Sequence, residues 1–111
     1  MISESDVERA VEFLRESAER AAMARANRIY LESWVKVVLA QQMAEWADES
    51  LGAQERIARC SQEYQDALKG LREAVREDEY HRFKRDAAAA LIEAWRTLQA
   101  NARAEGKAYG S

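Results

Sequence analysis

Apolar positions recur at helical spacing along almost the whole chain. In the first part of the sequence they follow one another every three or four residues, at Val7, Val11, Leu14, Ala18, Ala21 and Ala22. This spacing marks one face of an α-helix. The stripe then widens, and around residues 35–39 the helix becomes apolar on most sides. Such a helix is expected to contact neighbours on more than one face.

A second periodic pattern fills the latter half of the chain. It begins with Tyr64, Leu68, Leu71 and Val75, and continues with Tyr80, Phe83, Ala87, Leu91, Ala94, Trp95, Leu98 and Ala102. The spacing predicts a second long helix from about residue 62 to 104. The jump after Val75 resembles a phase slip that changes local supercoiling. Gly70 costs this helix about 1 kcal/mol relative to alanine, and marks either a close backbone approach or a slight bend.

Local signals place the ends of these helices. The sequence contains no proline, and only four glycines. Ser5 and Glu8 fit a capping box, so the first helix should begin near Ser5. Gly52 is the only glycine between the two patterns, which predicts that the chain turns there. A short helix over about 53–59 is expected to follow, with Ser61 as the N-cap of the second long helix.

The pattern therefore predicts an all-α fold, a long antiparallel helical hairpin of two long helices joined by a short one. We expect a single domain over residues 1–105 and a flexible C-terminal tail over 106–111. A helix of about forty residues is on the order of 65 Å long, and one seam cannot cover all of its aromatic side chains. An oligomeric helical bundle, a dimer or higher, is the economical solution. The predicted oligomer interface consists of Tyr30, Trp34, Val38, Phe83, Leu91 and Trp95.

Charge gives the chain no overall attraction to nucleic acid or to an anionic membrane. It has 17 basic and 20 acidic side chains and a net charge of -3. Two basic segments could nevertheless contact phosphates while neighbouring aromatic rings stack on bases. Solvated helix faces with local Arg–Glu pairs explain the same residues and are favoured. Glu93 and Arg96 could pair with the charged stripe of Arg25, Arg28 and Glu32 across an antiparallel hairpin. The candidate nucleic-acid contacts are Arg25, Arg28, Lys36, Arg82, Lys84 and Arg85.

No residue pattern indicates catalysis or metal binding. His81 and Cys60 are the only residues of their kinds, and a zinc site needs several such ligands at set spacing. No Glu-x-x-His pair, nucleophile triad or phosphate-binding loop is present. We therefore expect no enzyme, no cofactor and no metal. A lone cysteine favours a reducing cytoplasm, and the apolar run over residues 37–40 is far too short to span a membrane.

Three segments together resemble a known group of proteins. Residues 25–32, 61–75 and 92–97 are similar to small helical proteins that tailed phages and prophages encode. The resemblance supplies no catalytic residues. It implies a place in the host cytoplasm and an accessory role in phage DNA metabolism, because genes of this group often lie among replication and recombination genes.

Two hypotheses for function follow. The first is a non-enzymatic helical interaction or scaffold protein that self-associates, with a protein partner as a further possibility. The alternative is a nucleic-acid-binding accessory factor in phage replication or recombination. The acidic total makes the alternative less favoured, since only a segregated basic patch would overcome it.

Overall fold

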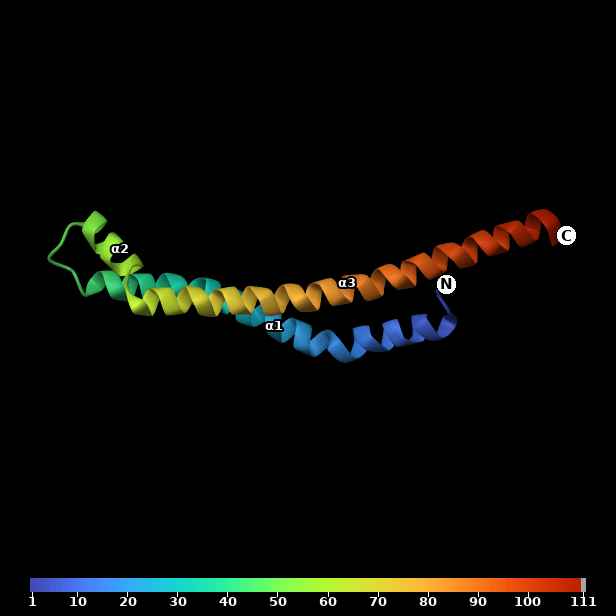
Figure 1. Cartoon of the computed structure of the whole chain (residues 1–111), viewed down its shortest axis with the longest axis horizontal. Helices are drawn as coiled ribbons and strands as arrows, with labels where there is room; N and C mark the ends of the chain where they lie inside the picture. The colour runs from blue at the N-terminus through green and yellow to red at the C-terminus, as the bar shows by residue number, and fades with distance from the viewer. Residues whose placement is uncertain (111) are drawn as a thin grey trace. The chain divides into compact units, whose positions relative to one another are not determined.

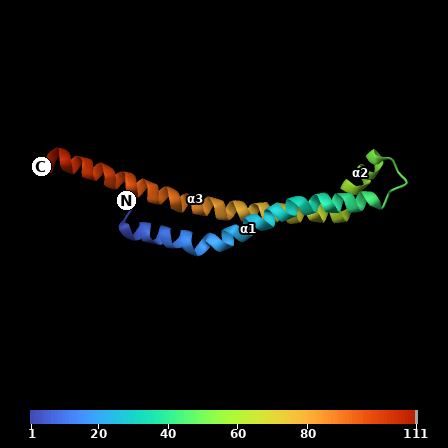
Figure 2. The same cartoon turned by 180° about the vertical axis from the view of Figure 1, so that it is seen from behind.

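The computed structural model describes residues 1–110, with side chains as far as residue 108. The described part contains three helices, α1 (Glu4–Ala44), α2 (Leu51–Arg59) and α3 (Gln62–Gly110), and no strand. The two long helices α1 and α3 pack against each other, and α2 lies between them in the chain (Figures 1 and 2). The predicted all-α helical hairpin is confirmed.

The chain divides into two compact units. Unit 1 combines residues 1–20 with α3 from His81 onward, and unit 2 consists of residues 21–80. In unit 2 a hydrophobic core forms around Val35, Val38 and Tyr64, with Leu39, Ala67, Leu68 and Leu71 packed against it. In unit 1 the most deeply buried side chain is small and polar, that of Ser17, at 2% exposed.

On each long helix one row of buried and half-buried residues alternates three- and four-residue steps, with further half-buried residues beside it. On α1 this row is Ala10, Leu14, Ser17, Ala21, Ala24, Arg28, Leu31, Val35, Val38 and Gln42. On α3 it is Tyr64, Ala67, Leu71, Ala74, Asp78, His81, Arg85, Ala88, Ile92 and Trp95. We call these two rows the seam. They repeat every seven residues, the period that keeps one helix row facing a partner helix.

The predicted phase slip after Val75 is wrong. The seam on α3 continues through this region without interruption, while Val75, Tyr80 and Phe83 lie off it and are exposed. Residues 74, 78, 81 and 85 take the buried positions, and they are alanine or polar residues. A prediction based on large apolar residues misses such positions and selects the exposed apolar residues next to them.

The first helix begins earlier than predicted because a different serine caps it. The backbone amide of Ser3 donates to Asp6 Oδ2 at 2.9 Å, and the amide of Asp6 donates to Ser3 Oγ at 3.1 Å. This reciprocal pair is the capping box, so the Ser5–Glu8 prediction is wrong. Ser5 lies inside the first turn of α1 and not at the N-cap position.

The connection between the long helices also differs from the prediction. After Ala44 the chain makes turns over residues 45–48. Ser50 then caps α2, and its hydroxyl accepts a hydrogen bond from the amide of Ala53 at 3.2 Å. Gly52 is inside the first turn of α2, and no described residue has a positive φ. The turn therefore needs no glycine and comes before Gly52, not at it.

The start of α3 is confirmed. Ser61 Oγ accepts from the backbone amide of Tyr64 at 3.2 Å, which caps the helix as predicted. α3 runs through Gly70 without a break, and a methyl group built there would meet nothing within 4 Å, so the glycine marks no close backbone approach. The helix continues to Gly110, beyond the predicted end near residue 104. The flexibility of residues 106–111 stays a prediction, and residue 111 lies outside the described residues.

Candidate interaction surfaces

An ion pair crosses the seam in unit 2. Arg28 Nε donates to Asp78 Oδ2 at 2.5 Å, and Arg28 Nη1 donates to Glu32 at 3.0 Å. The hydrogen bond to Asp78 is the main reason why the pKa of Arg28 is raised above its ordinary value. A partly buried pair of this kind fixes helix register more than it adds stability. The predicted pairing of Glu93 and Arg96 with this stripe is wrong, because these two bond to each other within α3, at 3.4 Å.

A second arginine crosses the seam in unit 1. Arg85 Nη1 donates to the backbone oxygen of Leu14 and to the hydroxyl of Ser17, both at 2.7 Å. The ammonium group of neighbouring Lys84 lies 5.5 Å from the ring centre of Phe13. These contacts join α1 to α3 within unit 1.

Two of the six candidate nucleic-acid contacts are thus already hydrogen-bonded to the opposite helix of the same chain. Arg28 and Arg85 would have to leave their partners across the seam to reach a phosphate. Arg25 and Lys36 are exposed in unit 2, on the side of α1 that also carries Glu32. Arg82 and Lys84 are exposed in unit 1. Neither unit gathers its candidate cations into a patch free of carboxylates, which weakens the nucleic-acid hypothesis.

Unit 2 has an extended surface without charge on the outer side of α1. Its members lie at three- and four-residue spacing, beside the seam but not part of it. All are exposed: Met23, Ala26, Asn27, Tyr30, Ser33, Trp34, Val37, Ala40 and Gln41. Met23 is 66% exposed, Tyr30 63% and Trp34 38%. We call this surface the uncharged face of α1, and it is unusual in a chain with 33% charged residues.

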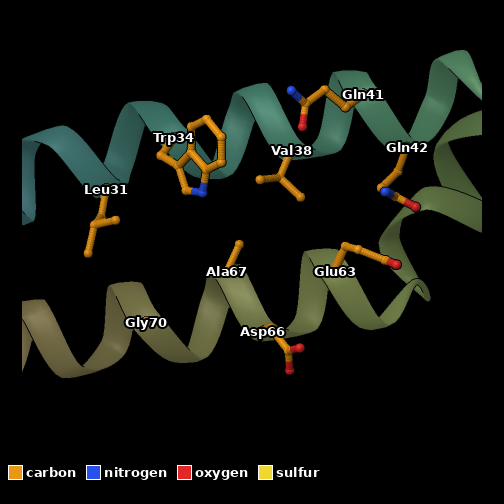
Figure 3. Close-up of a pocket in the computed structure, with 9 residues that line it drawn as sticks. All are labelled: Leu31, Trp34, Val38, Gln41, Gln42, Glu63, Asp66, Ala67 and Gly70. Carbon is orange, nitrogen blue, oxygen red and sulfur yellow. The ribbon is translucent and has the colours of Figure 1, made fainter.

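A groove of about 470 Å³ runs between this face and α3. Figure 3 shows Leu31 and Val38 directed from α1 toward α3 and Ala67 directed back toward α1, with the ring of Trp34 lying along α1 between Leu31 and Val38. Leu31 and Gly70 line the same groove, and its remaining lining comes from Gln41, Gln42, Glu63 and Asp66. Figure 3 also shows that Asp66 lies at the outer edge, with its carboxylate directed away from α1. The groove therefore has an apolar floor, an uncharged wall on α1 and carboxylates on the α3 wall.

Unit 1 carries its apolar surface on α3 instead. Five exposed residues lie along one side of the helix, at Phe83, Ala87, Ala90, Ala94 and Leu98. Phe83 is 63% exposed and Leu98 45%. We call this row the alanine face of α3, since its three central side chains are small enough to allow close approach of another helix.

The predicted interface residues fall into three environments. Tyr30 and Trp34 belong to the uncharged face, and Phe83 belongs to the alanine face. Val38 is 6% exposed, within the core of unit 2, and becomes available to another molecule only if the helices separate. Leu91 and Trp95 are half-buried. The prediction missed Met23 and Val37, although the seven-residue steps from 23 to 30 to 37 were visible in the sequence.

The described residues show no arrangement typical of a catalytic or metal centre. Among them, no three His, Cys, Asp or Glu side chains gather closely enough to hold a metal ion. Cys60 is exposed at the end of α2, and His81 is half-buried in the seam. No helix of the described chain has the length and apolar character needed to cross a membrane. The absence of enzymatic activity and of a cofactor stays a prediction.

Comparisons with protein-family models, with curated proteins and with solved structures found no match to this chain. The resemblance to small phage-encoded helical proteins, and the role that it implies, are therefore untested. Any functional argument must come from the surfaces described above.

Proposed function

We propose that this chain is a non-enzymatic helical interaction protein that self-associates. The observation that carries the proposal is the presence of large apolar side chains on surfaces without charge, outside the seam that the chain already buries. Tyr30 and Phe83, each 63% exposed, are the clearest examples. Covering such side chains removes apolar area from water, which is the main driving force of association.

The period of these surfaces supports a helical partner. The uncharged face of α1 repeats with the same seven-residue period as the seam, so α1 presents two parallel rows that can each face another helix. In a coiled coil in which α1 packs on α3 through one row and on a second chain through the other, both rows of α1 are covered. The alanine face of α3 offers unit 1 a comparable contact, in which small side chains let helix backbones approach closely.

Self-association is tested by placing a charge on each face. Tyr30→Glu and Phe83→Glu, separately and together, should shift the mass in sedimentation equilibrium toward that of a single chain, whereas the unaltered chain should form a dimer or larger assembly at micromolar concentration. Both side chains are largely exposed, so the helices should keep their circular dichroism. Leu51→Glu is the matched control, because Leu51 is 75% exposed on neither face, and glutamate is favoured in the first turn of α2.

The proposal fails if the unaltered chain remains a single copy at every concentration. It also fails if the Leu51 variant lowers the mass as much as the Tyr30 and Phe83 variants do. In the latter case any added charge, rather than either face, would explain the change.

A nucleic-acid-binding accessory factor in phage replication or recombination is the second candidate. Its support is the exposure of Arg25 and Lys36 in unit 2 beside the aromatic rings of Tyr30 and Trp34. Single-stranded DNA added to the same sedimentation runs at low salt tests it. Binding that weakens steeply as salt rises, and that is lost in Arg25→Gln and Lys36→Gln, would support this candidate.

A further inference from the structure

The groove beside Trp34 is lined by both long helices of unit 2. Its floor is formed by Leu31, Val38 and Ala67, and Gly70 leaves the α3 wall without a side chain. A methyl group at position 70 would have no atom within 4 Å, so space remains open there. Amphipathic helices bind such grooves with apolar residues at i, i+3, i+4 and i+7.

The two walls of the groove differ in charge. The α1 wall contributes Trp34 and Gln41 and no charged group, whereas the α3 wall contributes the carboxylates of Glu63 and Asp66. The side-chain amide of Gln62 donates a hydrogen bond to the carboxylate of Asp66 at 2.8 Å. An occupant that fits both walls is apolar on one side and cationic along the edge that meets α3.

The chain itself offers a poor match to these requirements. Its uncharged face on α1 is bordered by Arg25 and Lys36, and these two cations share that side of α1 with the carboxylate of Glu32. Its alanine face on α3 is bordered by Asp86 and Glu93, which lie three residues after Phe83 and Ala90. Placing that row on the groove would bring carboxylates near Glu63 and Asp66, and like charges at an interface are unfavourable.

We propose that this groove binds a basic amphipathic helix of a partner protein. Apolar residues of that helix cover Trp34, Leu31 and Val38, and its lysine or arginine side chains lie along Glu63 and Asp66. The site rests on the proposed function only in that the chain acts as an interaction protein. It adds a partner of different composition to the second copy proposed above.

The probe is a synthetic Leu–Lys peptide about 18 residues long, roughly five helical turns, with leucines at i, i+3, i+4 and i+7 and no tryptophan. Two control peptides replace every lysine by glutamate, or scatter the leucines so that no apolar face forms. Titration calorimetry with the full chain should detect the first peptide alone. Binding should alter the tryptophan emission, and Trp34→Phe should remove this change while Trp46→Phe retains it.

Position 70 provides a variant that closes the groove without weakening the fold. Gly70→Gln places a long, uncharged side chain in the open space, and should weaken peptide binding at least about tenfold, as expected when an anchoring pocket is blocked. Gly70→Ala is the matched control, since it raises helix propensity but leaves most of the groove open. Glu63→Gln with Asp66→Asn should weaken binding and reduce its salt dependence, whereas Asp86→Asn, outside the groove, should change neither.

The outcomes separate this site from self-association. If the chain stays a single copy and yet binds the Leu–Lys peptide, the groove proposal is supported and the proposed self-association is wrong. Equal binding of the scattered-leucine peptide, or undiminished binding by Gly70→Gln, overturns the groove proposal. If Gly70→Gln lowers the assembly mass and the peptide does not bind, the occupant is a second copy and the proposal is wrong.

Discussion

The alanine substitution Gly70→Ala measures directly whether α3 is a regular helix at the groove. Gly70 lies in the interior of the 49-residue helix α3. It is exposed, its φ is not positive, and the added methyl group would meet no atom within 4 Å. Replacing glycine by alanine at such a position restricts the unfolded chain and adds no strain to the folded one.

The expected gain follows from helix propensity alone, because no new contact forms. Alanine is favoured over glycine by about 1 kcal/mol in a helix interior. For a domain of this size the same free energy raises the melting temperature by about 4 °C. Urea denaturation followed by circular dichroism should therefore show a higher midpoint with an unchanged slope, measured at one fixed protein concentration because self-association also shifts the midpoint.

Gly106→Ala is the internal control for this measurement. Gly106 is also exposed in α3 with open space around it, but it lies in the last turns of the helix. Frayed ends contribute little to global unfolding, so this variant should leave the midpoint nearly unchanged. A neutral or destabilising effect of Gly70→Ala would refute the reasoning. It would mean that residue 70 is not in open helix, and the groove as described would not exist.

Two further predictions concern polar contacts of unit 1. Arg85→Ala leaves the buried Ser17 hydroxyl and the Leu14 carbonyl without their cross-seam donor, so it should lower the free energy of unfolding by about 1–3 kcal/mol. Arg82→Ala, at an exposed position, should lower it clearly less. Equal losses of the two variants in urea denaturation would contradict the assigned contact. The pKa of Asp6 is lowered mainly because its carboxylate accepts hydrogen bonds from the amide and hydroxyl of Ser3. This capping interaction therefore contributes stability above about pH 4, the ordinary range of the group, and loses it as pH falls through the lower pKa of the folded state. In an NMR titration Ser3→Ala should raise the pKa of Asp6 and Ser5→Ala should not; an unchanged pKa of Asp6 in Ser3→Ala would contradict the Ser3–Asp6 cap.

Much of the fold could be predicted because it depends on short-range effects. Long stretches without proline, rich in alanine, glutamate and arginine, have a high helix propensity when it is summed over many residues. Ser61 could be identified as a cap since its hydroxyl bonds to an amide only three residues away. The other cap was misplaced because Ser3 and Ser5 both precede an acidic residue by three positions, and the letters alone do not distinguish them.

The candidate surfaces could be predicted only in part. Exposed Tyr30 and Phe83 were identified because aromatic residues stand out on a charged helix. The groove was not identified, since it combines α1 with residues of α3 that are distant in sequence. The role of Gly70 was left open for the same reason, because its open space depends on what lies opposite.

The sequence by itself determined that this chain is helical, that two long helices are joined by a short one, and that they carry more apolar side chains than one seam can bury. Only the tertiary structure decided which row of each helix is buried. On α1 the row that contains Ala24 and Val35 and the row that contains Tyr30 and Trp34 have compatible spacing, and the first faces α3. The reason is steric and electrostatic: closely packed helices accept small side chains such as Ala74, and paired polar ones such as Asp78, at positions where a large aromatic ring would hold the backbones apart.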